Sequence, residues 1–160
     1  MRAQKLDRTL MCYRIGDPDG VYPIFDATAS RLYPGRWNTP ASPMIYASEH
    51  YSTAMLEKLV HGSGQLPPNQ HFIRITVPHG AAYEILNTAA LPDWYVEAGT
   101  VSKGYGEAWQ RGKRSLILIV PSVVARIESN ILINPEHPEF PKIETSLHQP
   151  VWWDKRLFAR

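Results

Sequence analysis

Three side chains that could do chemistry together lie in one stretch, YPGRWNTPASPMIYASEHYSTAMLEKLVHG at positions 33–62. Arg36, Tyr46 and Glu57 follow one another at intervals of ten and eleven residues. A guanidinium fork matches a pyrophosphate, an aromatic ring offers a flat stacking face, and a carboxylate stabilises positive charge that develops on a sugar. These residue types together suit a site that binds phosphate and stabilises a cation.

Each of the three residues also has a purely structural interpretation. Arg36 can bond loop carbonyls, and Tyr46 can be a core aromatic residue with a satisfied hydroxyl. On a helical wheel, the apolar side chains of residues 51–60 gather on one side. Glu57 falls on the opposite side, and this alone favours a solvated charge. Its neighbours on that side are His50, Thr53 and His61.

A loop, a strand and a helix must position these residues. Residues 43–48 predict a strand that carries the tyrosine, and residues 49–61 predict a helix that carries the glutamate. Ser48 is expected to cap the first amides of that helix, and Gly62 is expected to stop it. The arginine ends a long glycine- and proline-rich connection.

Short strands dominate the rest of the chain. Residues 115–122 are apolar and β-branched, which is typical of a strand covered on both faces. Helical residues around Val96 and over 107–110 are interrupted by glycines. Strands outnumber helices without regular alternation, so we expect one compact α+β domain over residues 1–160. The other predicted elements are strands over 11–15, 71–77, 81–86, 123–128, 131–134 and 149–153, and a helical turn over 27–31.

The composition limits the classes of function. The chain has 160 residues, 44% of them hydrophobic and 20% charged, as a globular domain does. The net charge is only +2 and Lys and Arg are scattered, which argues against a direct nucleic-acid partner. The first fourteen residues do not resemble a signal peptide, and residues 116–120 are too short a run to span a membrane, so we expect a cytoplasmic protein. Cys12 is expected in the core.

The commonest phosphate and zinc signatures are absent. The chain has no GxxxxGK[ST], no GxGxxG between a strand and a helix, and no HExxH. Its six histidines show no ligand spacing beside a cysteine or a carboxylate pair, so we expect no metal. Ser122 lacks the GxSxG surroundings of a serine nucleophile.

Several blocks together resemble the RES domain family, which is named for its arginine, glutamate and serine. The resemblance runs from about Tyr13 to Leu157, nearly the whole chain. The blocks, in order, are GRWN at 35–38, PMIYAS at 43–48, Ala54-x-x-Glu57, IVPS at 119–122, NILINPEHPEF at 130–140 and WWDKRL at 152–157.

The resemblance implies a fold like that of ADP-ribosyltransferases, a mixed sheet flanked by a few helices. It also implies an activity that consumes NAD without a metal, and a role as the toxin half of a bacterial toxin-antitoxin pair. The partner would be an Xre-like helix-turn-helix antitoxin that blocks the NAD cleft. The family positions correspond to Arg36, Tyr46, Glu57 and Ser122, with Arg14 as a further position and Ser115 as the other candidate serine.

These residues suggest a mechanism for breaking the bond between nicotinamide and ribose. Glu57 would stabilise an oxocarbenium-like transition state. Arg36, with Arg14, would hold the pyrophosphate. Tyr46 would stack on nicotinamide while its hydroxyl positions the ribose, and Ser122 would donate to the ribose or orient Arg36. Nicotinamide leaves as a neutral group, so one carboxylate suffices.

Alternatives stay open at this level. Glu107 could supply a second carboxylate. Water, phosphate or a protein side chain could attack the ribose, and we favour NAD breakdown because the sequence shows no long acceptor-recognition insertion. An inactive nucleotide-binding module is another interpretation, whereas scattered charges disfavour a toxin that attacks RNA. The C-terminal apolar residues are expected in the core rather than in an association patch; they are Trp152, Trp153, Leu157 and Phe158.

Overall fold

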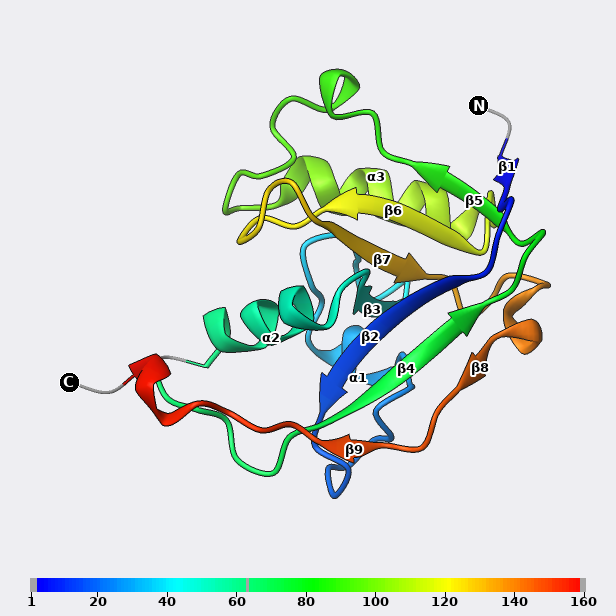
Figure 1. Ribbon diagram of the computed structural model, residues 1–160. Helices are drawn as coiled ribbons and strands as arrows, with labels where there is room; N and C mark the ends of the chain where they lie inside the picture. Colours follow the sequence, from blue (N-terminus) through cyan, green and yellow to red (C-terminus); the bar gives the residue numbers. More distant parts are fainter. Residues whose placement is uncertain (1–2, 63, 159–160) are drawn as a thin grey trace.

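A nine-stranded sheet forms the body of the protein in the computed structural model, which describes residues 3–62 and 64–158 (Figure 1). The strand order is β1-β5-β6-β7-β3-β2-β4-β8, with β9 also paired to β4. β5 and β6 run parallel, and every other neighbouring pair in the described chain is antiparallel. The predicted α+β class with a mixed sheet is confirmed. The strands are β1 (Gln4–Lys5), β2 (Leu10–Gly16), β3 (Ile45–Ser48), β4 (His71–Val77), β5 (Ala82–Ile85), β6 (Ile117–Pro121), β7 (Ser129–Ile133), β8 (Glu144–Thr145) and β9 (Gln149–Pro150).

Three α-helices and three short 3-10 helices complete the described chain. No helix in this part of the chain combines the length and the apolar character that a membrane crossing requires. The helices are α1 (Thr28–Leu32), α2 (Tyr51–Val60), α3 (Thr100–Arg111), η1 (Thr88–Ala90), η2 (Phe140–Lys142) and η3 (Lys155–Phe158).

Strand β6 is buried on both faces, as its apolar sequence predicts. Ile117 packs into one cluster with Ile131 and Ile133 of β7. Leu118 alternates to the other face and packs against Trp109 of α3. The two clusters form the core on the two sides of the sheet, and Cys12 is buried in the first of them.

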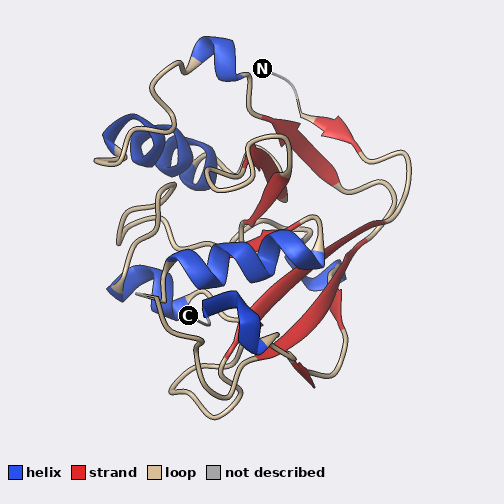
Figure 2. Ribbon diagram, turned by 60° about the vertical axis from the view of Figure 1, so that its left-hand side comes forward, coloured by secondary structure: helices blue, strands red, loops and turns tan. Residues whose placement is uncertain are grey.

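The longer helices α2 and α3 lie on the same side of the strands (Figure 2). Ala54 of α2 packs against Ile15 of β2, and Trp109 of α3 packs against β6. The cross-strand pairs Tyr13–Ser48 and Ser48–Asn130 show which side chains of β2, β3 and β7 share that helix-bearing face. The polar residues Ser48 and Asn130 therefore point toward the helices rather than toward the first apolar cluster.

The sheet is nearly split between β2 and β3. These strands share a single residue pair, Tyr13–Ser48, whereas β2 and β4 share seven pairs and β3 and β7 share four. The Arg14 side chain partly replaces the missing backbone hydrogen bonds between β2 and β3, because its Nη1 donates to the Tyr46 carbonyl of β3 at 2.8 Å. Its Nε donates to the Ile24 carbonyl at 2.6 Å. The split opens a hollow in the middle of the sheet.

Two predicted strands are wrong or too long. Residues 123–128 form bends and turns, because β6 and β7 are antiparallel neighbours that pair at Pro121–Ser129 and the chain must reverse between them. Of residues 149–153, only Gln149 and Pro150 belong to a strand. Trp152 is 76% exposed, and Leu157 and Phe158 are exposed as well, so the expectation of a core position is wrong for these three. Trp153 is partly buried and packs against the cluster of Ile15 and Ala54.

Two local predictions about the helices are also wrong. Ser48 does not cap α2: the helix begins after His50, which makes no side-chain cap bond, and the Ser48 hydroxyl instead donates to Asn130. Helix α3 runs through Gly104 and Gly106 without interruption. Gly106 is required where the helix meets the loop before β3, since a Cβ there would lie 1.8 Å from the Trp37 carbonyl oxygen.

Candidate active site

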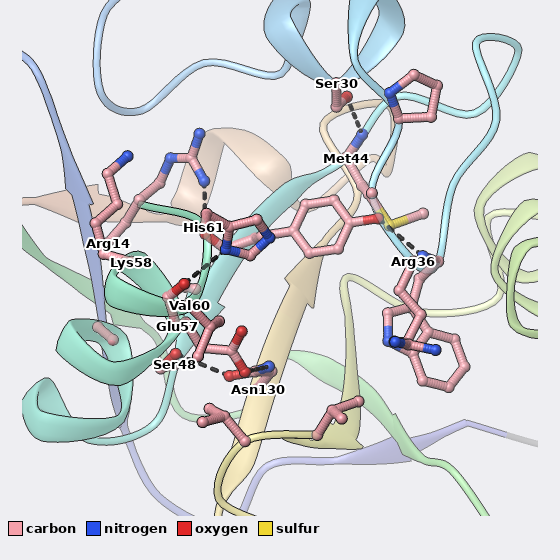
Figure 3. Close-up of a pocket in the computed structure, with 18 of the residues that line it drawn as sticks. Arg14, Ser30, Arg36, Met44, Ser48, Glu57, Lys58, Val60, His61 and Asn130 are labelled. Atoms are coloured by element: carbon pink, nitrogen blue, oxygen red, sulfur yellow. Dashed lines mark hydrogen bonds between the residues drawn. The ribbon is translucent and has the colours of Figure 1, made fainter. Parts of the chain in front are cut away.

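A cavity of about 890 Å³ opens at the split in the sheet. Residues of both separated strands line it, Arg14 from β2 and Tyr46 from β3 among them. The loop residue Arg36 and the helical residue Glu57 line the same cavity (Figure 3). A volume of this size is within the range of small-molecule sites in proteins. The loop, strand and helix that carry the three spaced residues therefore do meet around one hollow.

The Glu57 carboxylate is held on one oxygen. Its Oε1 accepts a hydrogen bond of 2.7 Å from the Ser122 hydroxyl and one of 2.8 Å from Nδ2 of Asn130. Within the described residues, Oε2 accepts no hydrogen bond. The first oxygen fixes the position of the side chain, and the second is free to face a ligand.

Helix α2 turns Thr53 and Glu57 inward together with part of its apolar side, against the expectation from the helical wheel. Thr53 is 2% exposed and Ala54 is buried, whereas the apolar Leu56 and Val60 are 42% and 59% exposed. The wheel describes hydrophobicity alone, but Asn130 of β7 and Ser122 after β6 satisfy the Glu57 carboxylate on this face. Glu57 is not a solvated surface charge.

Ser122 lies behind the glutamate, not in the cavity. It is fully buried, donates to Glu57 and accepts from the Ala125 amide at 3.1 Å. It orients the carboxylate rather than Arg36, so the expectation that it orients the guanidinium is wrong.

Ser115 is far less suited to the site: it accepts from the Trp109 indole and donates to the Ile117 carbonyl. Glu107 does not line the cavity and accepts from Thr39.

Tyr46 ties the arginine loop to the sheet. Its hydroxyl donates to Asn38 Oδ1 at 2.8 Å and accepts from the Trp37 amide at 3.0 Å. Gly35 packs on the ring so closely that a Cβ would lie 2.7 Å from the Tyr46 hydroxyl. Burial raises the pKa of this phenol above its ordinary value, so it stays protonated. Its proton is already donated, which leaves the ring rather than the hydroxyl as the group to offer a ligand.

Arg36 shapes the rim of the cavity. Its Nη1 donates to the carbonyls of Trp94 and Val96, at 3.2 Å and 2.7 Å. All hydrogen bonds of Arg36 to described residues come from this one nitrogen. Part of the fork thus holds the segment before α3, as the structural interpretation of this arginine expects, while the side chain still lines the cavity.

The cavity carries more positive than negative side chains. Burial lowers the pKa of the Lys58 ammonium, and the nearby charge of Arg14 lowers it further. Lys103 donates to the Gly35 carbonyl. The pKa of the Lys103 ammonium is lowered mainly by burial and also by the nearby charge of Arg36. Such crowding of cations favours an anionic ligand. The charged lining residues are Arg14, Arg36, Lys58 and Lys103 against Glu57 and Glu97.

Sequence reasoning missed three residues of this site. Asn130 sits in an apolar strand, where a single asparagine has no signature, although it opens the block NILINPEHPEF. Lys58 and Lys103 lie on helices whose charges look solvated in sequence. Among the described residues, no group of three or more metal-ligating side chains is present.

Comparisons with known proteins identify the family of the chain. The model of the RES domain matches residues 11–154. A protein of Sphingobium sp. (strain YBL2) named Prs ADP-ribosylating toxin is 33% identical over 159 residues, which cover 95% of this chain and 99% of the relative. A protein of Photorhabdus laumondii named Toxin Res is 31% identical over 136 residues, which cover 83% of this chain and 86% of the relative.

A solved structure shares the fold. The crystal structure of the M. tuberculosis MbcT-MbcA toxin-antitoxin complex contains a chain that superposes with a TM-score of 0.72 at 14% identity, over 91% of this chain and 85% of that one. The mixed sheet flanked by a few helices agrees with the fold that the family resemblance implies. The family model and the two relatives cover most of the chain, and it belongs to the RES domain family of toxins.

Proposed function

We propose that the protein is an enzyme that cleaves the bond between nicotinamide and ribose in NAD. The observation that carries this proposal is the Glu57 carboxylate, anchored through Oε1 in a cavity that is otherwise rich in cations. The open oxygen, Oε2, would stabilise the positive charge that spreads onto the ribose as the bond breaks. Nicotinamide departs as a neutral molecule, so the reaction needs no acid on the leaving side.

The cationic residues would bind the diphosphate of NAD. Arg14 and Lys58 lie together on one side of Glu57 in the cavity, and Arg36 lies on the other (Figure 3). A guanidinium binds phosphate oxygens through paired hydrogen bonds, and a lysine adds a point charge. The ring of Tyr46 would stack on a planar base, since its hydroxyl is already bonded within the protein.

The ribose carbon freed by the cleavage could react in two ways. Attack by water or phosphate would consume NAD outright, which we favour because no long insertion for recognising an acceptor protein interrupts the domain. The name of the Sphingobium relative favours a second function, ADP-ribosyl transfer to a protein such as the one called Prs. In both reactions the Glu57 carboxylate would stabilise the same oxocarbenium-like transition state.

As a toxin, the protein would work in the cytoplasm with an antitoxin partner. The similar solved structure is that of a toxin-antitoxin complex, which supports a protein partner that covers the toxin. We propose an Xre-like helix-turn-helix antitoxin that restricts access to the cavity. Neither nucleic acid nor a membrane is needed as a direct partner.

The test is nicotinamide release from NAD by the purified chain, compared with Glu57→Gln. The amide keeps the volume of the side chain but removes its charge, so we expect release to fall roughly 10²- to 10³-fold. Mass analysis with and without phosphate separates hydrolysis from phosphorolysis, and added Prs tests protein transfer. Equal release by wild type and Glu57→Gln, or no release with any acceptor, would refute the proposal.

A further inference from the structure

Asn130 links three strands to the candidate catalytic glutamate. It lies on β7, directly opposite Ser48 of β3 and opposite Val120 of β6. Its Nδ2 donates to Glu57 Oε1 at 2.8 Å, and its Oδ1 accepts from the Ser48 hydroxyl at 2.8 Å. It also lines the cavity, where Figure 3 shows it next to Glu57.

The chemistry of the partners fixes the orientation of the Asn130 amide. A carboxylate only accepts hydrogen bonds, so the atom that faces Glu57 must be the NH₂ group. The carbonyl oxygen of the amide then faces Ser48, which is 3% exposed and whose hydroxyl has a proton to donate. The acceptor-only carboxylate thus fixes the amide, and the Ser48 hydroxyl donates to the oxygen on its other side.

We infer that Asn130 is a positioning residue that aims the Glu57 carboxylate into the cavity, an inference that rests on the proposed NAD cleavage. A glutamate side chain has several rotatable bonds and is costly to fix in one conformation. Asn130 and Ser122 approach the same oxygen from two different segments, so two hydrogen bonds fix the position of Oε1. The unbonded Oε2 is thereby directed to the ligand.

The neutrality of these donors suits the reaction. A lysine or arginine at position 130 would also hold the carboxylate, but its charge would offset the negative charge that must stabilise the oxocarbenium ion. An amide and a hydroxyl hold Glu57 without cancelling that charge. The site therefore separates its cations, which line the wider cavity, from the neutral groups that touch the carboxylate.

The test compares Asn130→Ala, Asn130→Asp and Ser48→Ala in nicotinamide release. We expect Asn130→Ala to lower kcat roughly 10- to 100-fold with little change in KM, because a hydrogen bond to a charged group is lost while the ligand-binding cations remain. Asn130→Asp keeps the bond from Ser48 but sets a second carboxylate against Glu57, so its loss should be at least as large. Ser48→Ala should give a smaller loss.

A double substitution shows whether Asn130 acts through Glu57. In the Glu57→Gln background, Asn130→Ala should change the residual rate by no more than about 2-fold. Asn134→Ala is the matched control, because Asn134 is a buried asparagine just beyond β7 that donates to the Gln110 carbonyl. It should lower thermal stability and leave the kcat of the folded protein unchanged. An unchanged kcat in Asn130→Ala, or a full additive loss in the double variant, would overturn the inference.

A crystal structure of Asn130→Ala adds a readout that does not need turnover. We expect the Glu57 carboxylate to rotate or to adopt more than one conformation while α2 stays in place. A carboxylate that keeps its orientation would overturn the positioning role, whatever the enzyme does to NAD. Wild type that releases no nicotinamide would instead count against the proposed function alone.

Discussion

At the scale of single residues, the position of one carboxylate depends on three separate segments. Glu57 belongs to α2, Asn130 to β7, and Ser122 follows the end of β6. Ser122 can hold the carboxylate because the Ala125 amide donates to its oxygen and so leaves its proton for Glu57. The serine acts through the glutamate and does not itself line the cavity.

Ser115, just before β6, and Ser122, just after it, provide a matched test. Ser122 and Ser115 are both fully buried. Ser122→Ala should lower the kcat for nicotinamide release roughly 10- to 100-fold, because Glu57 loses a charge-assisted hydrogen bond. Ser115→Ala should leave kcat unchanged but cost about 1–3 kcal/mol of stability, since the Trp109 indole N–H loses its acceptor. Kinetics and chemical denaturation of both variants measure this, and the reverse pattern would contradict the assignment of Ser122.

The sequence predicts which residues surround the cavity better than it predicts what each one touches. Arg14, Arg36, Tyr46 and Glu57 all line the cavity. However, the Tyr46 hydroxyl and one nitrogen of Arg36 bond to the protein itself. Such contacts join segments far apart in the chain, and residue types alone do not specify them. Asn130 was missed for the same reason.

At the scale of elements, periodicity predicts the existence of α2 correctly but not its orientation. The wheel assigns Glu57 to the solvent, yet the structure turns Thr53 and Glu57 inward and leaves Leu56 exposed. An inward carboxylate is stable only when it has partners, and those of Glu57 come from β7 and from the residue after β6. The deviation from the hydrophobic pattern thus marks the candidate site.

Helix α3 contains two glycines with opposite surroundings, which makes them a paired test. A Cβ at Gly104 would meet no atom within 4 Å, whereas one at Gly106 would lie 1.8 Å from the Trp37 carbonyl oxygen. Gly104→Ala should raise the free energy of unfolding by about 0.5–1 kcal/mol, because alanine favours the helix. Gly106→Ala should lower it by about 1–3 kcal/mol and displace the loop that carries Arg36.

Urea denaturation checks both values, and nicotinamide release checks the loop. Activity of Gly104→Ala should match wild type, while Gly106→Ala should lose activity along with stability. A Gly106→Ala variant as stable as Gly104→Ala would show that the helix and the loop are not in contact in solution.

At the scale of the whole molecule, the split between β2 and β3 creates the cavity. The hydrophobic pattern predicts most strands, and β6 is buried on both faces as expected. The pattern does not reveal that β2 and β3 share one pair only, because pairing register between distant strands depends on the assembled sheet. The Arg14 side chain bonds across the split, and desolvation lowers the pKa of its guanidinium. The same arginine therefore supports the fold and lines the site.

The core also gives the molecule a defined response to alkaline pH through Cys12. Burial raises the pKa of the Cys12 thiol from 9.0 to about 12, and the charge of Glu49 adds to this. The unfolded chain thus loses the thiol proton at a lower pH than the native protein does. Between these two values the native state binds more protons, so stability falls as the pH rises, while below pH 9 the full contribution is present.

Urea denaturation between about pH 8 and pH 10.5 tests this response, with Cys12→Ala as the reference. We expect the difference in unfolding free energy between wild type and Cys12→Ala to be constant near pH 8 and to shrink above pH 9, with a limiting slope of about 1.4 kcal/mol per pH unit. Tyr46, whose pKa is also raised by burial, is present in both proteins and cancels from the difference. Parallel stability curves for the two proteins would show that the Cys12 thiol titrates as it does in the unfolded chain, and that the core around β2 is open to water.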